Sequence, residues 1–382
     1  MKITDIRTIV VGNPWKNWVF VVVETSDGIS GLGEATGGLS TMPNKEAVEE
    51  IKHLAIGKNP LEISNIVDEL YKALFLKMTP AVAAIEIACW DILGKHLKVP
   101  IYQLLGGKVR DKVRVYANGW YSGERSPENF GEKAKSLADK GYTALKFDPF
   151  GSEYLRLDKE SEIFIKKIVR SVRDAVGPNV ELMIEGHKRF NAVEAIKIAN
   201  WLNEFEVTWF EDPIDNDDID SLIHVSNNSP VRIIAGEGFD DHKDFTRFVS
   251  SNATDIVNPE VMRIGGISGA VKVAGICSSF DAELAFHNAE SPLKTMTNLQ
   301  LCGAINNIYI QECFDEFNED WIEELFPNYE KVKDGYLYIP DRPGLGISIN
   351  ENVAKDHPYN KSNFLRMFKP GWENRKGAKD SE

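Results

Sequence analysis

The amino-acid sequence predicts an α/β protein built around a (β/α)8 barrel, with a smaller α+β domain at the N-terminal end. Its 382 residues are enough for one large domain and a companion. After residue 112, eight short apolar runs alternate with amphipathic helical stretches, and each run ends in a polar residue. We expect a capping domain at 1–112, the barrel at 113–327, and a segment at 328–382 that packs back on the capping domain.

The capping domain is predicted from three strand-like segments followed by helical ones. Residues 3–12, 18–28 and 29–35 show strand patterns, and the turn Ser26-Asp27-Gly28 suits an antiparallel hairpin. Apolar residues then recur with helical spacing at 45–57, 61–74 and 79–97. Glu86 and Asp91 interrupt the most apolar of these helices, so no membrane-spanning segment is expected.

Eight barrel strands are predicted in the second part of the chain. They lie at residues 113–118, 144–148, 181–187, 208–212, 232–237, 254–260, 282–287 and 308–312. The carboxyl ends of barrel strands meet at one face, where barrel enzymes place their active sites. The polar residues at these ends are Asn118, Asp148, Glu185 with His187, Glu211, Glu237, Glu260, His287 and Glu312.

Three of these carboxylates predict a metal site. Glu185, Glu211 and Glu237 follow one another at steps of 26 residues, one β-α unit each. Converging carboxylates repel one another unless a cation lies between them, and oxygen ligands without cysteine favour Mg²⁺ over Zn²⁺. We therefore expect one Mg²⁺ per subunit, held by these three residues.

The composition limits the possible partners. A net charge of −14 argues against a nucleic-acid surface, which needs clustered Lys and Arg, and no nucleotide-binding glycine motif is present. The four cysteines form no CxxC pair, and the first residues lack the features of a signal peptide. These observations favour a cytoplasmic protein that binds a small molecule rather than a membrane.

Several motifs at the strand ends resemble those of a known family. They are IEGH (184–187), WFEDP (209–213), AGEGF (235–239), DIVNPEVMRIGGIS (255–268) and AFHNAESP (285–292). Together they resemble the consecutive barrel motifs of the enolase superfamily, mandelate racemase branch, whose members have a modified barrel and a capping domain. ANGWY (117–121), KFDPFG (146–151) and FHNA (286–289) are most similar to its sugar-acid dehydratases of the gluconate type.

The resemblance implies a Mg²⁺-dependent hydro-lyase. Such an enzyme converts an aldonic acid, for example gluconate, galactonate, arabinonate or xylonate, to the 2-keto-3-deoxy acid, with the metal stabilising the ene-diolate. By this resemblance His287 is the base that removes the C2 proton, and Glu260 orients it. His187 is the acid for the departing 3-hydroxyl or, alternatively, a supporting polar residue. Glu312 binds the substrate carboxylate or forms a salt bridge.

The pair Lys146 and Asp148 departs from the branch. Its members often have Lys-x-Lys here, and the second Lys acts as a base on the opposite face of the substrate. Asp148 replaces that Lys, which weighs against the alternative of a racemase or epimerase. Lys146 is then expected to take part in catalysis, and Asp148 to bind substrate, unless the two form a salt bridge. A catalytically silent barrel used for binding is a more remote alternative.

Substrate choice is expected to lie in the capping-domain loops 12–18 and 37–41. Substrate-binding candidates are Trp15, Lys16, Asn17 and Trp18, joined by Asn118 at the end of the first barrel strand. Both tryptophans suit the core of the hairpin equally well. Members of the family commonly form dimers to octamers, so the resemblance also implies a homo-oligomer.

Overall fold

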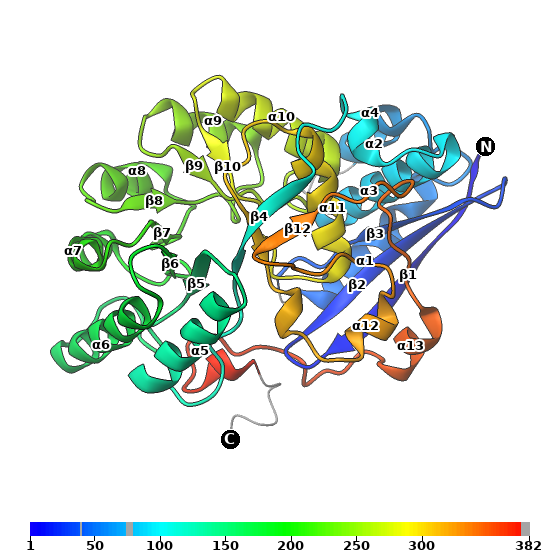
Figure 1. The fold of residues 1–382 in the computed structure, drawn as a ribbon. Coiled ribbons are helices and arrows are strands. Elements are labelled where there is room, and N and C mark those ends of the chain that lie inside the picture. Colours follow the sequence, from blue (N-terminus) through cyan, green and yellow to red (C-terminus); the bar gives the residue numbers. More distant parts are fainter. Residues whose placement is uncertain (39, 74–78, 376–382) are drawn as a thin grey trace.

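The first domain of the computed structural model is a three-stranded antiparallel sheet covered by helices (Figure 1). The structure describes residues 1–38, 40–73 and 79–375. The strands β1 (Ile3–Asn13), β2 (Lys16–Thr25) and β3 (Ser30–Glu34) lie in chain order, which confirms the predicted antiparallel arrangement. Asn13 pairs with Lys16, so a two-residue turn joins β1 to β2 and places Trp15 at the tip of the hairpin.

Four α-helices follow this sheet. They are α1 (Thr41–Ile51), α2 (Ile63–Ala73), α3 (Thr79–Leu97) and α4 (Ile101–Leu104), with a 3-10 turn at Lys52–Leu54. β3 lies directly against α3 because two of its residues are glycines. A Cβ atom on Gly31 or Gly33 would collide with the backbone of Ala88 or Ala84. Leu74, expected to end the second helix, lies outside the described residues.

The two acids that interrupt α3 are buried and hold it to other parts of the chain. Glu86 accepts a hydrogen bond from the backbone N–H of Ser268, 2.8 Å away, in the first turn of α10 (Gly266–Ser278). A carboxylate is favourable there because the N-terminus of a helix carries partial positive charge. Asp91 accepts from the backbone of Leu345 at 2.9 Å. Within the described ranges, no helix combines the length and apolar character needed to cross a membrane.

The second domain is a barrel of eight parallel strands, each inside or beside a predicted run. These are β4 (Lys112–Ala117), β5 (Ala144–Phe147), β6 (Glu181–Glu185), β7 (Trp209–Glu211), β8 (Arg232–Ile234), β9 (Ile256–Val257), β10 (Glu283–Leu284) and β11 (Gln311–Cys313). Pairing runs in the order β11-β4-β5-β6-β7-β8, and β9 pairs with β10. A backbone hydrogen bond from Asn258 to Ala235 and a bridge between Leu284 and Ile308 close the ring.

One apolar side chain from or next to each of the eight barrel strands fills the interior of the barrel. The eight residues form one buried cluster: Tyr116, Ala144, Met183, Trp209, Ile234, Ile256, Ala285 and Ile310. Tyr116 of β4 packs edge-on against Trp209 of β7, with 5.6 Å between ring centroids. This packing confirms the predicted barrel, because side chains from all eight strands meet in one layer.

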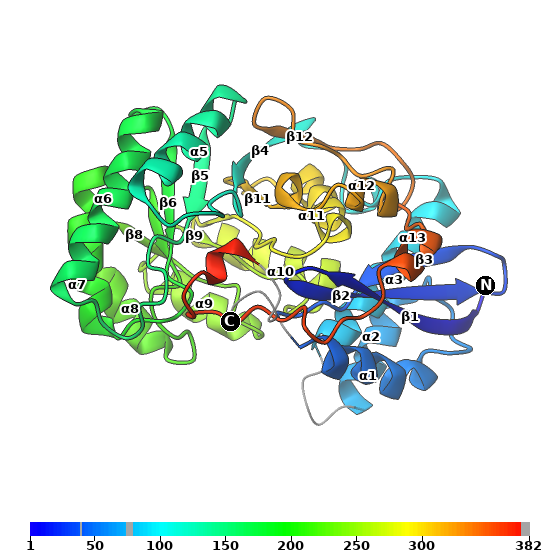
Figure 2. The same cartoon turned by 90° about the horizontal axis from the view of Figure 1, so that it is seen from below.

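A helix connects each barrel strand to the next. In order they are α5 (Pro127–Asp139), α6 (Lys159–Val176), α7 (Ala192–Leu202), α8 (Ile219–Asn227), α9 (His242–Ser250), α10 and α11 (Pro292–Ala304), with 3-10 turns at Asn203–Phe205 and Asp315–Phe317. These helices form the outer layer of the barrel (Figures 1 and 2). The carboxyl ends of the parallel strands lie together at one face of the barrel.

The C-terminal segment contacts both domains. It contains α12 (Ile322–Leu325), β12 (Tyr336–Tyr338), which pairs antiparallel with β4, and α13 (Glu351–Asp356). Glu351 forms a 2.6 Å ion pair with Arg7 of β1, so this part packs on the capping domain. The chain then continues to a 3-10 turn at Trp372–Asn374, next to the barrel mouth (Figure 2). Residues 376–382 lie outside the described residues.

Candidate active site

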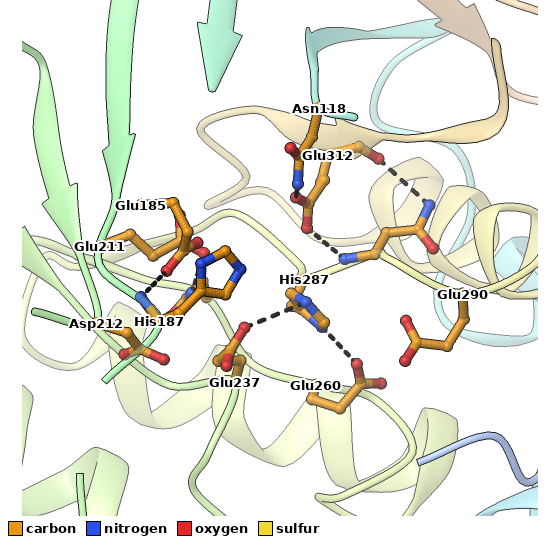
Figure 3. A network of polar contacts seen from close by, with 12 residues as sticks. Asn118, Glu185, His187, Glu211, Asp212, Glu237, Glu260, His287, Glu290 and Glu312 are labelled. Atoms are coloured by element: carbon orange, nitrogen blue, oxygen red, sulfur yellow. Dashed lines mark hydrogen bonds and ion pairs between the residues drawn. The ribbon is translucent and has the colours of Figure 1, made fainter. Parts of the chain in front are cut away.

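Most polar residues at the strand ends of the barrel line one pocket, which the capping domain and the C-terminal segment also line. Glu211 and Glu312 are completely buried and do not belong to this lining. Figure 3 shows Glu185 and His187 on one side, His287 with Glu260 on the other, and Glu237 between them. Each of these five residues lies at or just past the end of its strand, as the sequence predicts.

His287 is held by a carboxylate on the neighbouring strand end. Its Nδ1 lies 2.7 Å from Oε2 of Glu260. Glu260 is in turn fixed by the backbone N–H of Met262, which donates to Oε1 at 3.0 Å. The second ring nitrogen, Nε2, lies 3.2 Å from Oε2 of Glu237. The imidazole is therefore oriented with one nitrogen toward the pocket, as a base requires.

Neighbouring carboxylates favour the protonated form of His287. Burial alone would lower the pKa of His287, but Glu237 and Glu260 favour the imidazolium and raise the pKa above its ordinary value. His287 is therefore suited to accept a proton.

His187 has a carboxylate partner of its own, which is Asp148. The Nδ1 of His187 lies 2.6 Å from Oδ2 of Asp148. Arg189 bonds to the same carboxylate oxygen, and the backbone N–H of Phe150 donates to Oδ1 at 2.8 Å. The structure corrects two expectations for Asp148. It is fully buried behind His187 rather than lining the pocket, and it pairs with His187 rather than with Lys146.

A strained backbone presents His187 to the pocket. His187 and Lys188 both adopt positive φ angles, of 48° and 59°, in a region that residues other than glycine rarely occupy. The turn is held by hydrogen bonds from the backbone N–H of His187 to Oε1 of Glu185 and from that of Lys188 to the carbonyl of Asp212. The chain therefore turns immediately after β6 and brings Glu185 and His187 to the same pocket.

Lys146 lies at the centre of a buried acidic group. Its Nζ is 2.6 Å from Glu211, 2.9 Å from Glu312 and 3.1 Å from Glu185. Burial by itself lowers the pKa of Lys146, but the three carboxylates raise it well above its ordinary value. Asn118 donates to Oε1 of Glu312 at 2.7 Å and so orients that carboxylate. Lys146 thus partly neutralises this acidic group. Glu312 already bonds to Lys146 and Asn118, and its expected contact with the substrate carboxylate would compete with these two bonds.

The acids around Lys146 are not fully compensated. Burial raises the pKa of Glu211 well above its ordinary value, and repulsion from Glu185 raises it further. Glu237 lies apart from them and pairs with Lys188 at 3.3 Å and with His287. Of the three predicted metal ligands, Glu185 and Glu211 are therefore buried carboxylates that repel each other, whereas Glu237 is partly exposed and paired with Lys188 and His287.

A second group of possible metal ligands has its ligand atoms closer together than the predicted trio. In the part of the chain that the structure describes, Glu260, His287 and Glu290 place one ligand atom each within 4.8 Å of one another, a condition that the predicted trio does not meet. Two lysines already neutralise this group. Lys294 bonds to Glu260 and lies 3.3 Å from Glu290, and Lys16 lies 2.9 Å from Glu290. The predicted carboxylates have lysine partners as well, because Lys146 pairs with Glu185 and Glu211 and Lys188 pairs with Glu237.

The substrate-binding candidates of the capping domain separate into two pairs. Trp15 and Lys16 line the pocket, as does Asn118. Trp18 is completely buried beside Phe20, with ring centroids 6.2 Å apart, and belongs to the hairpin core. Asn17 bonds to the backbone of Asn360 and Asn363 and so holds the C-terminal segment instead. The second loop contributes Gly37 and Gly38 to the lining, while Leu39 lies outside the described residues.

Other pocket residues were missed by the sequence analysis. They are Tyr121, Lys188, Arg263, Ala289, Glu290, Phe314, Leu365, Met367, Trp372, Glu373 and Arg375, joined by Lys294 behind the pocket. A local signal existed for Glu290 and Lys294, which follow a predicted strand end and are four residues apart, at helical spacing. The aromatic and basic residues of the C-terminal segment carry no such signal because they follow no barrel strand.

Comparison with known proteins identifies the family. Residues 7–106 match the N-terminal domain of mandelate racemase / muconate lactonizing enzyme, and residues 129–353 match the enolase C-terminal domain-like family. The chain is 34% identical to the D-gluconate dehydratase of Thermoproteus tenax, over 94% of this chain and 73% of that protein. It is 35% identical to the D-gluconate/D-galactonate dehydratase of Picrophilus torridus, over 94% of this chain and 93% of that protein.

A solved structure of the same type supports the assignment. The mandelate racemase/muconate lactonizing enzyme from Sulfitobacter sp. superposes with a TM-score of 0.88 at 29% identity, covering 94% of this chain and 96% of that one. Both domains therefore match in sequence and in structure. This chain belongs to the mandelate racemase / muconate lactonizing enzyme family of the enolase superfamily.

Proposed function

We propose that the protein is a sugar-acid dehydratase, a hydro-lyase that converts an aldonic acid to its 2-keto-3-deoxy acid. Relatives named as gluconate and gluconate/galactonate dehydratases support the reaction class. The observation that carries the proposal is a pair of histidines, His187 and His287, on two sides of one pocket, each held by its own carboxylate. Elimination of water needs two such groups, a base for the proton and an acid for the hydroxide.

His287 is assigned the first proton transfer. Its Nδ1 is engaged by Glu260, so Nε2 takes the proton from C2 of the bound acid. The carboxylates around the ring stabilise the imidazolium that forms, as they favour its charged state. The electron pair of the broken C–H bond passes to the substrate carboxylate, which becomes an ene-diolate. It forms the C2–C3 double bond only when the C3–O bond breaks in the second transfer.

His187 is assigned the second transfer. Asp148 and Arg189 fix the ring through its Nδ1 side, which leaves Nε2 to donate a proton to the 3-hydroxyl. The C3–O bond breaks, water leaves, and the resulting enol tautomerises to the 2-keto acid. The overall change is loss of one water molecule, so no oxidant or reductant is needed.

Glu185, Glu211 and Glu237 would hold a divalent cation, for which we propose Mg²⁺. The donor set fits, since it offers only carboxylate oxygens and the pKa of Glu211 is raised by burial and by repulsion from Glu185. When bound, the cation would supply a Lewis acid for the substrate carboxylate. Lys146, already among these acids, would add a fixed positive charge beside them.

The direct test is to incubate the purified protein and Mg²⁺ with gluconate, galactonate, arabinonate and xylonate, and to measure α-keto acid. We expect product from at least one acid, and loss of nearly all activity in His287→Gln. His224→Gln is the matched control because His224 is exposed on α8, far from any strand end. A folded protein that forms no keto acid from any substrate would refute the proposal.

One observation also favours a racemase or epimerase. That reaction needs a proton-transferring group on each face of the substrate, and two imidazoles line this pocket. The two activities differ in product. A racemase in D₂O would invert C2 and incorporate deuterium without forming any keto acid, whereas the dehydratase forms keto acid.

A further inference from the structure

Residues 357–375 of the C-terminal segment form a strap that runs from the capping domain to the barrel (Figure 2). Leu365, Trp372 and Arg375 of this strap line the pocket. Its first end is tied to the capping domain, where the backbone N–H of Gly12 donates to the carbonyl of His357 at 2.8 Å. Its other end is tied to the barrel, where Nε1 of Trp372 donates to the carbonyl of Gly151 at 2.9 Å. The strap therefore bridges the two domains at the mouth of the pocket.

The strap adds an apolar wall to an otherwise charged site. Leu365 and Trp372 form one buried cluster with Trp15 of the hairpin tip and Phe314, which follows β11. The ring of Trp372 lies edge-on to His187, with centroids 5.3 Å apart. This wall covers one side of the histidine assigned as the acid.

Arg375, at the end of the strap, has a guanidinium that pairs with no carboxylate of the described residues. Among the described residues it forms no ion pair, whereas Lys16, Lys146 and Lys188 of the same pocket are all held by carboxylates. Within the described chain its guanidinium donates one hydrogen bond, to the carbonyl of Gly119, and lies over the Phe314 ring at 4.6 Å. Burial lowers its pKa to about 10.

The guanidinium of Arg375 therefore has N–H donors that are not used in these contacts. A guanidinium carries five N–H donors in a planar fork, and buried donors without acceptors are costly. Arg263 also lines the pocket without an ion pair, but no side-chain hydrogen bond or ring contact within the described chain fixes its guanidinium. Arg375 is therefore the fixed, incompletely paired cation of this lining.

Arg375 contacts the chain just beyond the carboxyl end of strand β4. Tyr116 of β4 belongs to the interior layer of the barrel, Asn118 follows the strand and bonds to Glu312 of the acidic group, and the next residue, Gly119, accepts a hydrogen bond from Arg375. The chain thus passes from the barrel interior to the acidic group and then to Arg375, which lies on the outward side of that group.

We propose that Arg375 binds the hydroxyl groups at the end of the sugar acid remote from its carboxylate, so that the strap selects substrates by chain length. This inference rests on the proposed dehydratase function, in which the carboxylate end lies deep in the barrel beside Lys146. Neighbouring hydroxyls match the paired N–H donors of a guanidinium, which a single ammonium cannot reproduce.

The test compares kcat/KM for aldonic acids of four, five and six carbons in the full-length protein. Arg375→Gln is expected to lower kcat/KM for the six-carbon acid by about 10- to 100-fold, the effect of losing a charged hydrogen bond. The four-carbon acid should change less than about twofold, since it does not reach the strap. Arg375→Lys, which keeps the charge but not the fork, should recover only part of the loss.

Arg366→Gln is the matched control, because Arg366 lies on the same strap and is exposed. It should leave all three values unchanged. An equal loss for every chain length in both Arg375 variants would assign Arg375 a purely structural role, and an unchanged six-carbon value would exclude the contact. If the wild-type protein converts no acid at all, the proposed function itself fails, and this inference with it.

Discussion

Asp148 is the residue at which this chain departs most clearly from the Lys-x-Lys pattern expected at this strand end. In place of a second base, the structure has an aspartate that binds Nδ1 of His187 and is itself bound by Arg189. The ionic partner of Lys146 is the acidic group of Glu185, Glu211 and Glu312 instead. At this position the chain thus has a carboxylate that orients His187.

Asp148→Asn is predicted to lower kcat by about 10²- to 10⁴-fold, because the amide no longer stabilises the required tautomer and charge of His187. KM should change little, since Asp148 does not line the pocket. Steady-state kinetics with the best aldonic acid measures both constants.

Asp139→Asn is the control for this substitution, because Asp139 is an exposed acid at the end of α5. It should behave as wild type. A fully active Asp148→Asn protein would show that His187 needs no orienting carboxylate.

At the scale of elements, the barrel strands could be predicted because each is an apolar run with a polar end. The parallel strands share one face, so Glu185, His187, Glu237, Glu260 and His287 had to meet there. Partners far apart in the chain could not be predicted in this way. Asp148 and Arg189 are 41 residues apart and Trp372 and Gly151 are 221 apart, and no local periodicity records such contacts.

The contact between β3 and α11 provides a test of how the two domains are joined. Glu34 at the end of β3 accepts a hydrogen bond from the hydroxyl of Ser291, the residue that caps α11, at 2.5 Å. The other carboxylate oxygen of Glu34 is buried without a hydrogen-bond partner among the described residues. Burial raises the pKa of Glu34 to about 8.

This raised pKa makes the interface sensitive to pH. Between pH 5 and pH 8 the unfolded chain has released the Glu34 proton while the folded protein retains it, so the free energy of unfolding falls as the pH rises. Glu34→Gln stays neutral and lacks this dependence. Its free energy of unfolding relative to wild type should therefore increase between pH 5 and pH 8, by on the order of a few kcal/mol.

Urea unfolding of both proteins at the two pH values measures this difference, and the other titrating groups cancel in the comparison. Glu24→Gln, on the partly exposed Glu24 of β2, provides the control. A difference that stays constant or decreases with pH would contradict a protonated Glu34 at this interface.

At the scale of the whole molecule, three parts of the chain complete one site. The barrel supplies the histidines and acids, the hairpin tip supplies Trp15 and Lys16, and the strap supplies Trp372 and Arg375. Lys16 connects the first two parts through Glu290, which also contacts Lys294 beside the His287–Glu260 pair. The position of the capping domain is thereby coupled to the surroundings of the proposed base.

Binding of a divalent cation should stabilise the whole protein. Mg²⁺ added to the metal-free protein at 100 times its dissociation constant is expected to stabilise the folded state by about 2.7 kcal/mol, seen as a rise in Tm. The reason is relief of the repulsion between Glu185 and Glu211. Glu211→Gln should largely lose this rise, whereas Glu283→Gln, altered at the opposite end of the barrel on β10, should keep it. Equal shifts in both variants would place the cation elsewhere.

The roles of His287 as base and His187 as acid are tested most directly by incubating variants with the substrate acid in D₂O. His187→Gln should still exchange the C2 proton for deuterium, because His287 and Glu260 remain in place, but should form almost no keto acid. His287→Gln should lose both exchange and product. NMR of the recovered acid measures exchange, and a keto-acid assay measures elimination. Normal keto-acid formation by His187→Gln, or C2 exchange at the wild-type rate in His287→Gln, would contradict the assigned roles.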